Sequence, residues 1–507
     1  MQTYTLASAI PQPHHVYSHN TRLGNLRGLT ETSENKTVYQ FRRVPYAKPP
    51  ILHLRFEKPK QFGSWNRTLN ATEYGPSCIQ YIYDNDKRLL PNTDISEDCL
   101  FLNIIAPNDL KNTSRRPVFI WIHGGGFTSG QGMMIDGSVF AATGDVVVVT
   151  FNYRLNIFGF VNVGKGSPRN LGLWDQISAM QWIKDNIEDY GGDPQTMTIF
   201  GESAGGVSVG LQAIIPRNIG LFQRAIAQSG SSLSRLQIVT DSEKLTRKIG
   251  GDLNCTECRN GVWSCLECLR NVSAKKLLRA FEDAIQLIHK GFSLKEPIGP
   301  TIDGDLIPNK PIHMLLDPNS TGSKMFNSID FMTGSNDGEG GLLYFNLISE
   351  QSNFNFDLKR GIPSRVVCDH IAPTVSRDVL GVEGCDNVTR AICNEYSSVG
   401  ASISLKQETS LAINLFGDME MSSTAEQALY FHSRSQKKSY QYLFTHKPTW
   451  GLISERPSWL LGANHADELA FIFGLKRWYP KDVNISSAES KLSSRMMSYW
   501  LNFGKTG

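Results

Sequence analysis

The stretch Met197-Thr198-Ile199-Phe200-Gly201-Glu202-Ser203-Ala204-Gly205 joins a short apolar run to a GxSxG motif. Residues 197–200 predict a buried strand, and residues 204–215, which stop at Pro216, predict a helix. A sharp turn between the two needs small residues on either side of the serine, and it lifts the hydroxyl to the carboxyl end of a sheet. The motif therefore predicts that Ser203 is a catalytic nucleophile; a serine in an ordinary tight turn is the alternative.

Short apolar runs alternate with helical patterns around this motif. Residues 118–122 and 146–151 predict buried strands, and residues 175–186 carry apolar side chains at helical spacing. Helices are also expected over residues 275–289 and 487–503, and a strand end over residues 330–334. Strands that alternate with helices across short turns are typical of a mostly parallel sheet covered on both faces. We expect one large α/β domain over residues 1–507.

The composition excludes several classes of protein. The 507 residues include 51 basic and 48 acidic side chains, and the net charge of +3 gives no strong attraction to nucleic acid or to anionic membranes. Apolar residues make up 40% and charged residues 20%, which is ordinary for a globular protein. No run approaches the roughly 18 apolar residues that span a bilayer. These values argue against a channel, a fibrous protein and a nucleic-acid binder driven by bulk charge.

A run of three glycines follows the strand predicted over residues 118–122, in the sequence His123-Gly124-Gly125-Gly126-Phe127. Three successive glycines are costly to order, so they are expected where the backbone must approach a ligand closely. Two N–H groups of this run, together with the N–H of Ala204, would hold a developing oxyanion. A flexible glycine-rich loop is the alternative interpretation.

A serine nucleophile needs a histidine to take its proton and a carboxylate to orient that histidine. The histidines after Ser203 are His289, His313, His370, His432, His446 and His465. His465 stands out because it lies in a loop that leads into an apolar segment. For the acid, Asp337 and Glu339 share a glycine-rich turn after an apolar run. Spacing alone does not choose between these two carboxylates.

Cysteines and glycosylation sequons indicate an oxidising, extracellular route. The nine cysteines are Cys78, Cys99, Cys255, Cys258, Cys265, Cys268, Cys368, Cys385 and Cys393. The nine sequons begin at Asn35, Asn66, Asn70, Asn112, Asn254, Asn271, Asn319, Asn387 and Asn484. The pairs Cys255/Cys258 and Cys265/Cys268 have zinc-ligand spacing, but their short separation and the sequon at Asn254 favour disulfides. We expect a secreted or extracellular protein.

The ends of the chain are less informative. The first thirty residues contain no signal-peptide pattern, and the chain stops abruptly at Thr506-Gly507. We expect that one or both ends are missing, which leaves a C-terminal anchor open.

These motifs together resemble the type-B carboxylesterase family, which includes the cholinesterases and bile-salt-activated lipases, along nearly the whole chain. The resemblance implies an α/β-hydrolase fold. Besides the GxSxG motif and the glycine run, the matching stretches are residues 44–50, 54–56, 96–103, 151–154, 191–194 and 228–230.

The resemblance assigns roles to individual residues. It implies Ser203 as nucleophile, Glu339 as acid and His465 as base, with oxyanion donors at Gly125, Gly126 and Ala204. It also pairs Cys78 with Cys99 and Cys255 with Cys268, which leaves Cys258 and Cys265 as a nested pair. The pairing of Cys368, Cys385 and Cys393 stays open.

The substrate expectation rests on departures from the cholinesterases. Members of that group that this chain resembles carry, between the first two cysteines, a tryptophan that stacks on the choline cation. Residues 79–98 contain no tryptophan, and Leu89 stands near the expected position. His123 also stands where cholinesterases usually have tyrosine. A neutral ester with an apolar acyl or alcohol part is therefore expected rather than acetylcholine.

The sequence thus predicts a serine hydrolase that cleaves carboxylic esters through an acyl-enzyme, with a small-molecule ester as its partner. No cofactor, metal or nucleic acid is expected, and the oligomeric state stays open. A cholinesterase or a bile-salt-type lipase is the nearer alternative. A non-enzymatic, adhesion-type member of the family is the more distant one.

Overall fold

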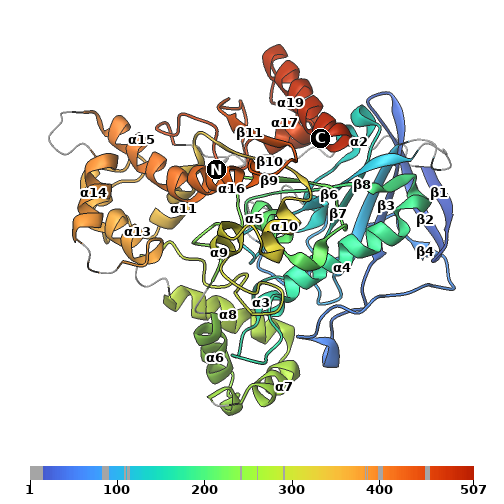
Figure 1. Cartoon of the computed structure of the whole chain (residues 1–507), viewed down its shortest axis with the longest axis horizontal. Helices are drawn as coiled ribbons and strands as arrows, with labels where there is room; N and C mark the ends of the chain where they lie inside the picture. The colour runs from blue at the N-terminus through green and yellow to red at the C-terminus, as the bar shows by residue number, and fades with distance from the viewer. Residues whose placement is uncertain are drawn as a thin grey trace.

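One mixed sheet organises the fold in the computed structural model, which describes residues 15–82, 91–107, 110, 115–239, 242–259, 261–288, 292–382, 384, 386–397, 403–451 and 457–507 (Figure 1). Its strands run in the order β1 (His15–Thr21), β2 (Gly24–Ser33), β3 (Lys36–Pro45), β5 (Phe101–Pro107), β7 (Val147–Phe151), β6 (Arg116–Ile122), β8 (Gly192–Glu202), β9 (Arg224–Gln228), β10 (Asp330–Asn336) and β11 (Ser439–Phe444). The short β4 (Leu69–Asn70) pairs with β2.

Strand direction divides this sheet in two. The strands from β1 to β7 pair antiparallel, whereas those from β7 through β6, β8, β9 and β10 to β11 pair parallel. Parallel strands place their carboxyl ends at one edge of the sheet, where ligands bind in open α/β sheets. The residues that follow β6, β8 and β10 are therefore brought to the same edge.

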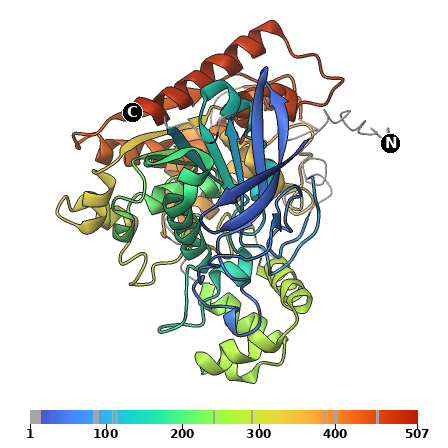
Figure 2. The ribbon, with the colours of Figure 1, turned by 90° about the vertical axis from the view of Figure 1, so that its right-hand side faces the viewer.

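Both faces of the sheet are covered by helices. Side chains alternate between the two faces of a strand, so neighbouring residues of β6 pack into different clusters. Val118 and Ile120 of β6 belong to one buried cluster, which includes the buried side chains of α4 (Leu171–Asn186) and α5 (Ala204–Gln212). Phe119 and Trp121 belong to a second cluster with α2 (Ser138–Gly144), α17 (Leu469–Phe473) and α19 (Ser487–Thr506). Figure 2 shows α19 lying along this face.

Of the remaining helices, α6, α7 and α8 are grouped together and α13, α14 and α15 form another group (Figure 1). Their bounds are α3 (Asn156–Phe160), α6 (Ser242–Asp252), α7 (Trp263–Asn271), α8 (Ala274–Ile288), α9 (Pro311–Leu316), α10 (Thr321–Phe326), α11 (Leu343–Leu347), α12 (Ser364–Val366), α13 (Ala372–Asp378), α14 (Asp386–Tyr396), α15 (Leu405–Phe416), α16 (Ser423–His432) and α18 (Leu475–Trp478). Within the described ranges, no helix has the length and apolarity required to cross a bilayer.

The predicted elements are present, with shifted ends. The strand before the serine is longer than expected and starts at Gly192, while α5 ends at Gln212 rather than at residue 215. Helix α4 starts at Leu171, four residues before its apolar spacing becomes visible in the sequence. The expectation of a mostly parallel, doubly covered sheet is confirmed. That of a single domain stays a prediction.

Four disulfides join eight of the nine cysteines: Cys78–Cys99, Cys255–Cys268, Cys258–Cys265 and Cys368–Cys393. The first two are the pairings that the resemblance implies, and the third is the nested pair. The zinc interpretation is wrong because all four of its cysteines are bonded to one another. Cys385 lies outside the described residues.

Eight of the nine sequon asparagines are solvent-exposed: Asn35, Asn66, Asn70, Asn254, Asn271, Asn319, Asn387 and Asn484. Asn112 lies outside the described residues. Exposure makes these eight side chains accessible to a glycosyltransferase, and their modification stays a prediction.

Candidate active site

Ser203 lies at the turn between β8 and α5, with φ +60° and ψ −127°. Its backbone N–H donates to the carbonyl of Gln228 on the neighbouring strand at 3.0 Å. A Cβ added to Gly205 would lie 2.1 Å from the carbonyl oxygen of Ile122, so only glycine fits there. The positive φ of a non-glycine residue is a strained conformation of the kind that clusters at active sites.

The glycine run lies directly beside this serine. A Cβ on Gly124 would meet the carbonyl of Glu202 at 2.6 Å and the Cβ of Ser203 at 3.0 Å. Gly125 and Gly126 adopt positive φ values of +107° and +58°. The start of the glycine run thus packs against Ser203, both predicted donors line the same cavity as this serine, and Ala204 takes the first position of α5.

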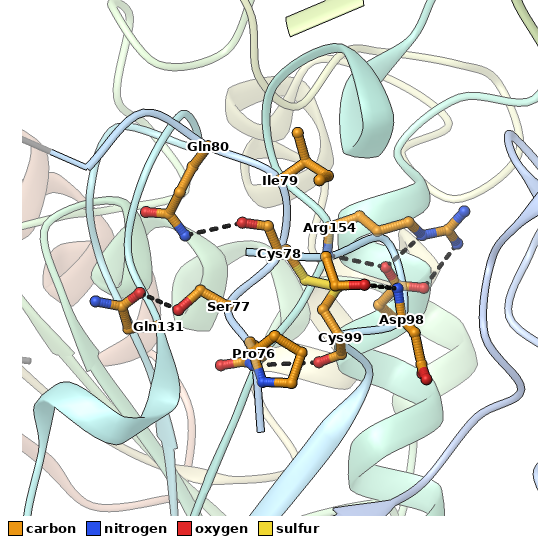
Figure 3. The surroundings of a disulfide bond; sticks show 12 residues. Pro76, Ser77, Cys78, Ile79, Gln80, Asp98, Cys99, Gln131 and Arg154 are labelled. Atoms are coloured by element: carbon orange, nitrogen blue, oxygen red, sulfur yellow. Dashed lines mark hydrogen bonds and ion pairs between the residues drawn. A yellow bond between two sulfur atoms is a disulfide. The ribbon is translucent and has the colours of Figure 1, made fainter. Parts of the chain in front are cut away.

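The disulfide Cys78–Cys99 supports the other end of this loop (Figure 3). Gln80 donates to the carbonyl of Cys78 at 3.1 Å, and it exchanges two hydrogen bonds with the backbone of Gly130, at 2.8 and 2.9 Å. Ser77 donates to the side chain of Gln131. Both glutamines line the cavity in front of Ser203, so the disulfide fixes one of its walls.

The structure distinguishes the two candidate acids. Nδ1 of His465 lies 2.6 Å from Oε2 of Glu339, whose other oxygen accepts from the backbone N–H of Asn336 at 2.8 Å and from the hydroxyl of Ser229. Asp337 instead accepts the backbone N–H of Ala463 at 2.7 Å, in the loop that carries His465. Glu339 is thus the carboxylate that contacts the imidazole, whereas Asp337 contacts the loop that carries it.

The link between histidine and serine is not formed in this structure. Nε2 of His465 lies 3.0 Å from Oε1 of Glu202, without hydrogen-bond geometry. No hydrogen bond joins this imidazole to the hydroxyl of Ser203 among the described residues. Both side chains line the same cavity, of about 530 Å³, together with Gly124, Gly125 and Gly126. A change in the side-chain orientation of His465 or Ser203 would be required to join them.

Buried carboxylates control the charge of this site. Burial lowers the pKa of His465, but Glu202 and Glu339 outweigh it and raise the pKa well above the ordinary value for histidine. Glu468 accepts from Asn336 at 2.7 Å and from Gln228 at 3.0 Å. Its burial, followed by repulsion from Glu202 and Glu339, raises its pKa to about 8. The imidazole therefore lies beside two carboxylates, Glu202 and Glu339, that favour its protonated form.

Two of these carboxylates were not given roles from the sequence. Glu202 occupies a variable position of GxSxG, and Glu468 follows His465 by three residues. No sequence pattern at either position predicts that the side chain is buried. Leu89, expected near the choline position of cholinesterases, lies outside the described residues.

The turn at Ser203 lies at the carboxyl edge of the parallel strands. Together with this strand order, it is typical of the α/β-hydrolase fold. The chain belongs to the carboxylesterase family, whose sequence model matches residues 16–507. It is 31% identical over 504 residues to a medium-chain fatty acyl-CoA hydrolase precursor of Anas platyrhynchos, covering 96% of this chain and 84% of that protein. It is 33% identical to acetylcholinesterase of Bungarus fasciatus, with coverage of 96% and 78%.

Relatives whose names do not describe a hydrolase match this chain to a similar degree. The chain is 32% identical over 528 residues to neuroligin-2 of Mus musculus, which covers 96% of this chain but only 60% of that protein. Membership of the family is therefore clear, whereas the activity requires its own argument from the site.

Proposed function

We propose that this protein hydrolyses carboxylic esters through an acyl-enzyme on Ser203. The observation that carries the proposal is the 2.6 Å contact between Nδ1 of His465 and Glu339, at a cavity that Ser203 also lines. A buried carboxylate in this position fixes the imidazole tautomer that leaves Nε2 free to accept a proton.

The reaction begins when Nε2 of His465 takes the proton of Ser203 and the serine oxygen attacks the ester carbonyl. The N–H groups of Gly125, Gly126 and Ala204 stabilise the oxyanion, and the imidazolium then protonates the departing alcohol. Water attacks the acyl-enzyme with the same histidine as base, which releases the acid and restores Ser203. Loss of a single oxyanion donor costs about 3–4 kcal/mol of transition-state stabilisation.

The Ser203→Ala variant tests the assignment. Hydrolysis of a short-chain nitrophenyl ester should fall by about 10⁶-fold, while circular dichroism and thermal unfolding stay unchanged. Turnover at the wild-type rate in a folded Ser203→Ala protein would falsify the assignment.

A non-enzymatic role is the second candidate, and it is supported by the match to neuroligin-2 and by the unformed hydrogen bond between serine and histidine. Fluorophosphonate labelling separates the two. A hydrolase should be labelled at Ser203 and protected by an ester substrate, whereas a protein without this activity should not react. The disulfides and the exposed sequons further support a secreted or extracellular location for either function.

A further inference from the structure

A group of hydrogen-bond acceptors lies in the wall of the active-site cavity, apart from the proposed triad. Glu420 belongs to the π-helical turn Gly417–Ser422, is 2% exposed and lines the cavity. One carboxylate oxygen accepts from the hydroxyl of Ser234. The other, Oε2, is buried and has no hydrogen-bond partner among the described residues. A buried acceptor left unpaired costs about 1–3 kcal/mol, and more when it is charged.

Gln237 adds a second unpaired acceptor to the same wall. Its side chain is 6% exposed, and its Oε1 has no hydrogen-bond partner within the described part of the chain. The hydroxyl of Ser234 accepts the backbone N–H of Gln237 at 3.1 Å while it donates to Glu420. Ser234 therefore links the Glu420 side chain to the backbone of Gln237, and both residues line the cavity.

Glu296 connects this group to the predicted oxyanion hole. Its Oε1 lies 3.5 Å from the point where a Cβ on Gly126 would stand. Glu296 lines the active-site cavity and also a neighbouring cavity of about 700 Å³. An occupant of the acceptor group would therefore be close to a carbonyl bound at Ser203.

Burial makes both carboxylates difficult to ionise. It raises the pKa of Glu296 to about 7. It also raises the pKa of Glu420 to about 7, against the opposite effect of the Ser234 hydroxyl and of the nearby backbone N–H groups of Arg235 and Leu236, and Glu296 adds repulsion. A neighbouring cation would favour the ionised form of both groups.

The cavity is lined by an imidazole with a raised pKa, that of His465, which contacts Glu339 and Glu202. Of the described residues that line it, none is lysine or arginine, and the surrounding wall includes apolar Leu236, Leu294 and Phe416. An ammonium group brings N–H donors and a positive charge, and so complements every acceptor in this wall. Its carbon chain would contact the apolar side chains.

We propose that Glu420, Gln237 and Glu296 form a subsite for a protonated amine carried by the ester substrate. The proposal rests on the proposed hydrolase function for its turnover assay. It departs from the neutral ester expected from the sequence, because that expectation did not consider the buried side chains of the cavity wall.

Matched ester pairs test the charge preference and the side of the ester that carries the amine. On the acyl side, the nitrophenyl ester of β-alanine is compared with nitrophenyl butyrate. On the alcohol side, dimethylaminoethyl acetate is compared with isoamyl acetate. Each pair has nearly the same shape and differs in one positive charge. In the wild-type protein, kcat/KM for the cationic member of one pair should exceed that of its neutral partner by about tenfold.

The variants Glu420→Gln and Glu296→Gln should each reduce the ratio of kcat/KM between the cationic and the neutral member of that pair to about one. Glu426→Gln, an exposed glutamate on α16, is the matched control and should keep the preference. Thermal unfolding of each variant establishes that it is folded, and two variants guard against the failure of one. Equal rates for the two members of both pairs in the wild type, or an unchanged preference in both folded variants, would overturn the proposal.

Calorimetric titration with butylammonium examines the subsite without any turnover. The wild type should bind it, and Glu420→Gln should bind at least about tenfold more weakly, since removal of one partner from a buried charge pair is costly. Binding that is lost in the variant supports the subsite even if no ester is hydrolysed, and the hydrolase proposal alone would then fail. Equal binding by both proteins would overturn the subsite.

Discussion

The Glu339→Gln variant examines the choice of acid that the sequence leaves open. In the structure the Glu339 carboxylate accepts from the backbone of Asn336 and from Ser229, and it contacts Nδ1 of His465 at 2.6 Å. A glutamine keeps the shape of this side chain but replaces one acceptor oxygen with an N–H₂ donor. If that donor faces Nδ1, the imidazole must carry its proton on Nε2, where it is unable to accept the proton of Ser203.

The expected effect follows from the loss of both tautomer control and charge. The comparable substitution in a serine protease triad lowers kcat by about 10⁴-fold, equivalent to about 5.5 kcal/mol. Because the two remaining hydrogen bonds to Glu339 come from Asn336 and Ser229, a glutamine oxygen that keeps them forces its N–H₂ toward His465. We therefore expect kcat/KM to fall by about 10³ to 10⁴-fold, with little change in thermal unfolding.

The assay is hydrolysis of a short-chain nitrophenyl ester by purified protein, and the matched control is Asp337→Asn. The Asp337 oxygen that accepts the N–H of Ala463 is retained as an amide oxygen in this variant, so kcat/KM should stay within about threefold of the wild type. The reasoning would be refuted by a folded Glu339→Gln protein with near wild-type activity. It would equally be refuted if Asp337→Asn, and not Glu339→Gln, caused the large loss.

Three further perturbations extend these tests. Glu202 and Glu339 raise the pKa of His465, and the neutral imidazole is the reactive base, so activity should fall as the pH drops through a value above the ordinary histidine pKa of about 6.5. The Glu202→Gln variant should move this acidic limb of the kcat/KM profile to lower pH. An acidic limb that stays at the same pH would contradict the electrostatic argument. Replacing Cys78 and Cys99 with serine should lower the free energy of unfolding by about 3 kcal/mol in denaturant titrations, from the entropy of a loop with a sequence separation of 21. Phe119→Ala should lower the free energy of unfolding by about 3–5 kcal/mol in the same experiment. The buried ring of Phe119 packs against the rings of Phe140 and Phe200, at centroid distances of 5.0 and 5.7 Å. A loss below about 1 kcal/mol would show that neighbouring side chains fill the space.

The sequence predicted those parts of the site that depend on one short stretch of chain. The turn at Ser203 follows from a strand, small neighbours and a helix within residues 197–215, and all of these are local properties. The glycine run after β6 could be predicted for the same reason. A glycine-rich turn after an apolar run also indicated Asp337 and Glu339 as candidate acids. Their partners lie more than a hundred residues further along the chain: Asp337 accepts from Ala463, and Glu339 contacts His465.

The acceptor group in the cavity wall shows the opposite situation. Ser234 and Gln237 come from one segment and Glu296 and Glu420 from two others, and none of them belongs to a recognisable motif. Their importance arises from burial and from unpaired oxygens, which are properties of the folded molecule. The orientation of His465 toward Glu202 is of the same kind, since it depends on a contact between side chains of different segments.

By itself, the sequence determined the strand–serine–helix turn, the alternation of strands and helices, and the small set of candidate acids and bases, because backbone sterics and hydrophobic periodicity act over a few residues. Only the tertiary structure decided which carboxylate meets the imidazole, where the buried acceptors collect and which charges share one cavity. Those features depend on the parallel order β8, β9, β10, which brings distant segments to a single sheet edge where burial strengthens their electrostatic interactions.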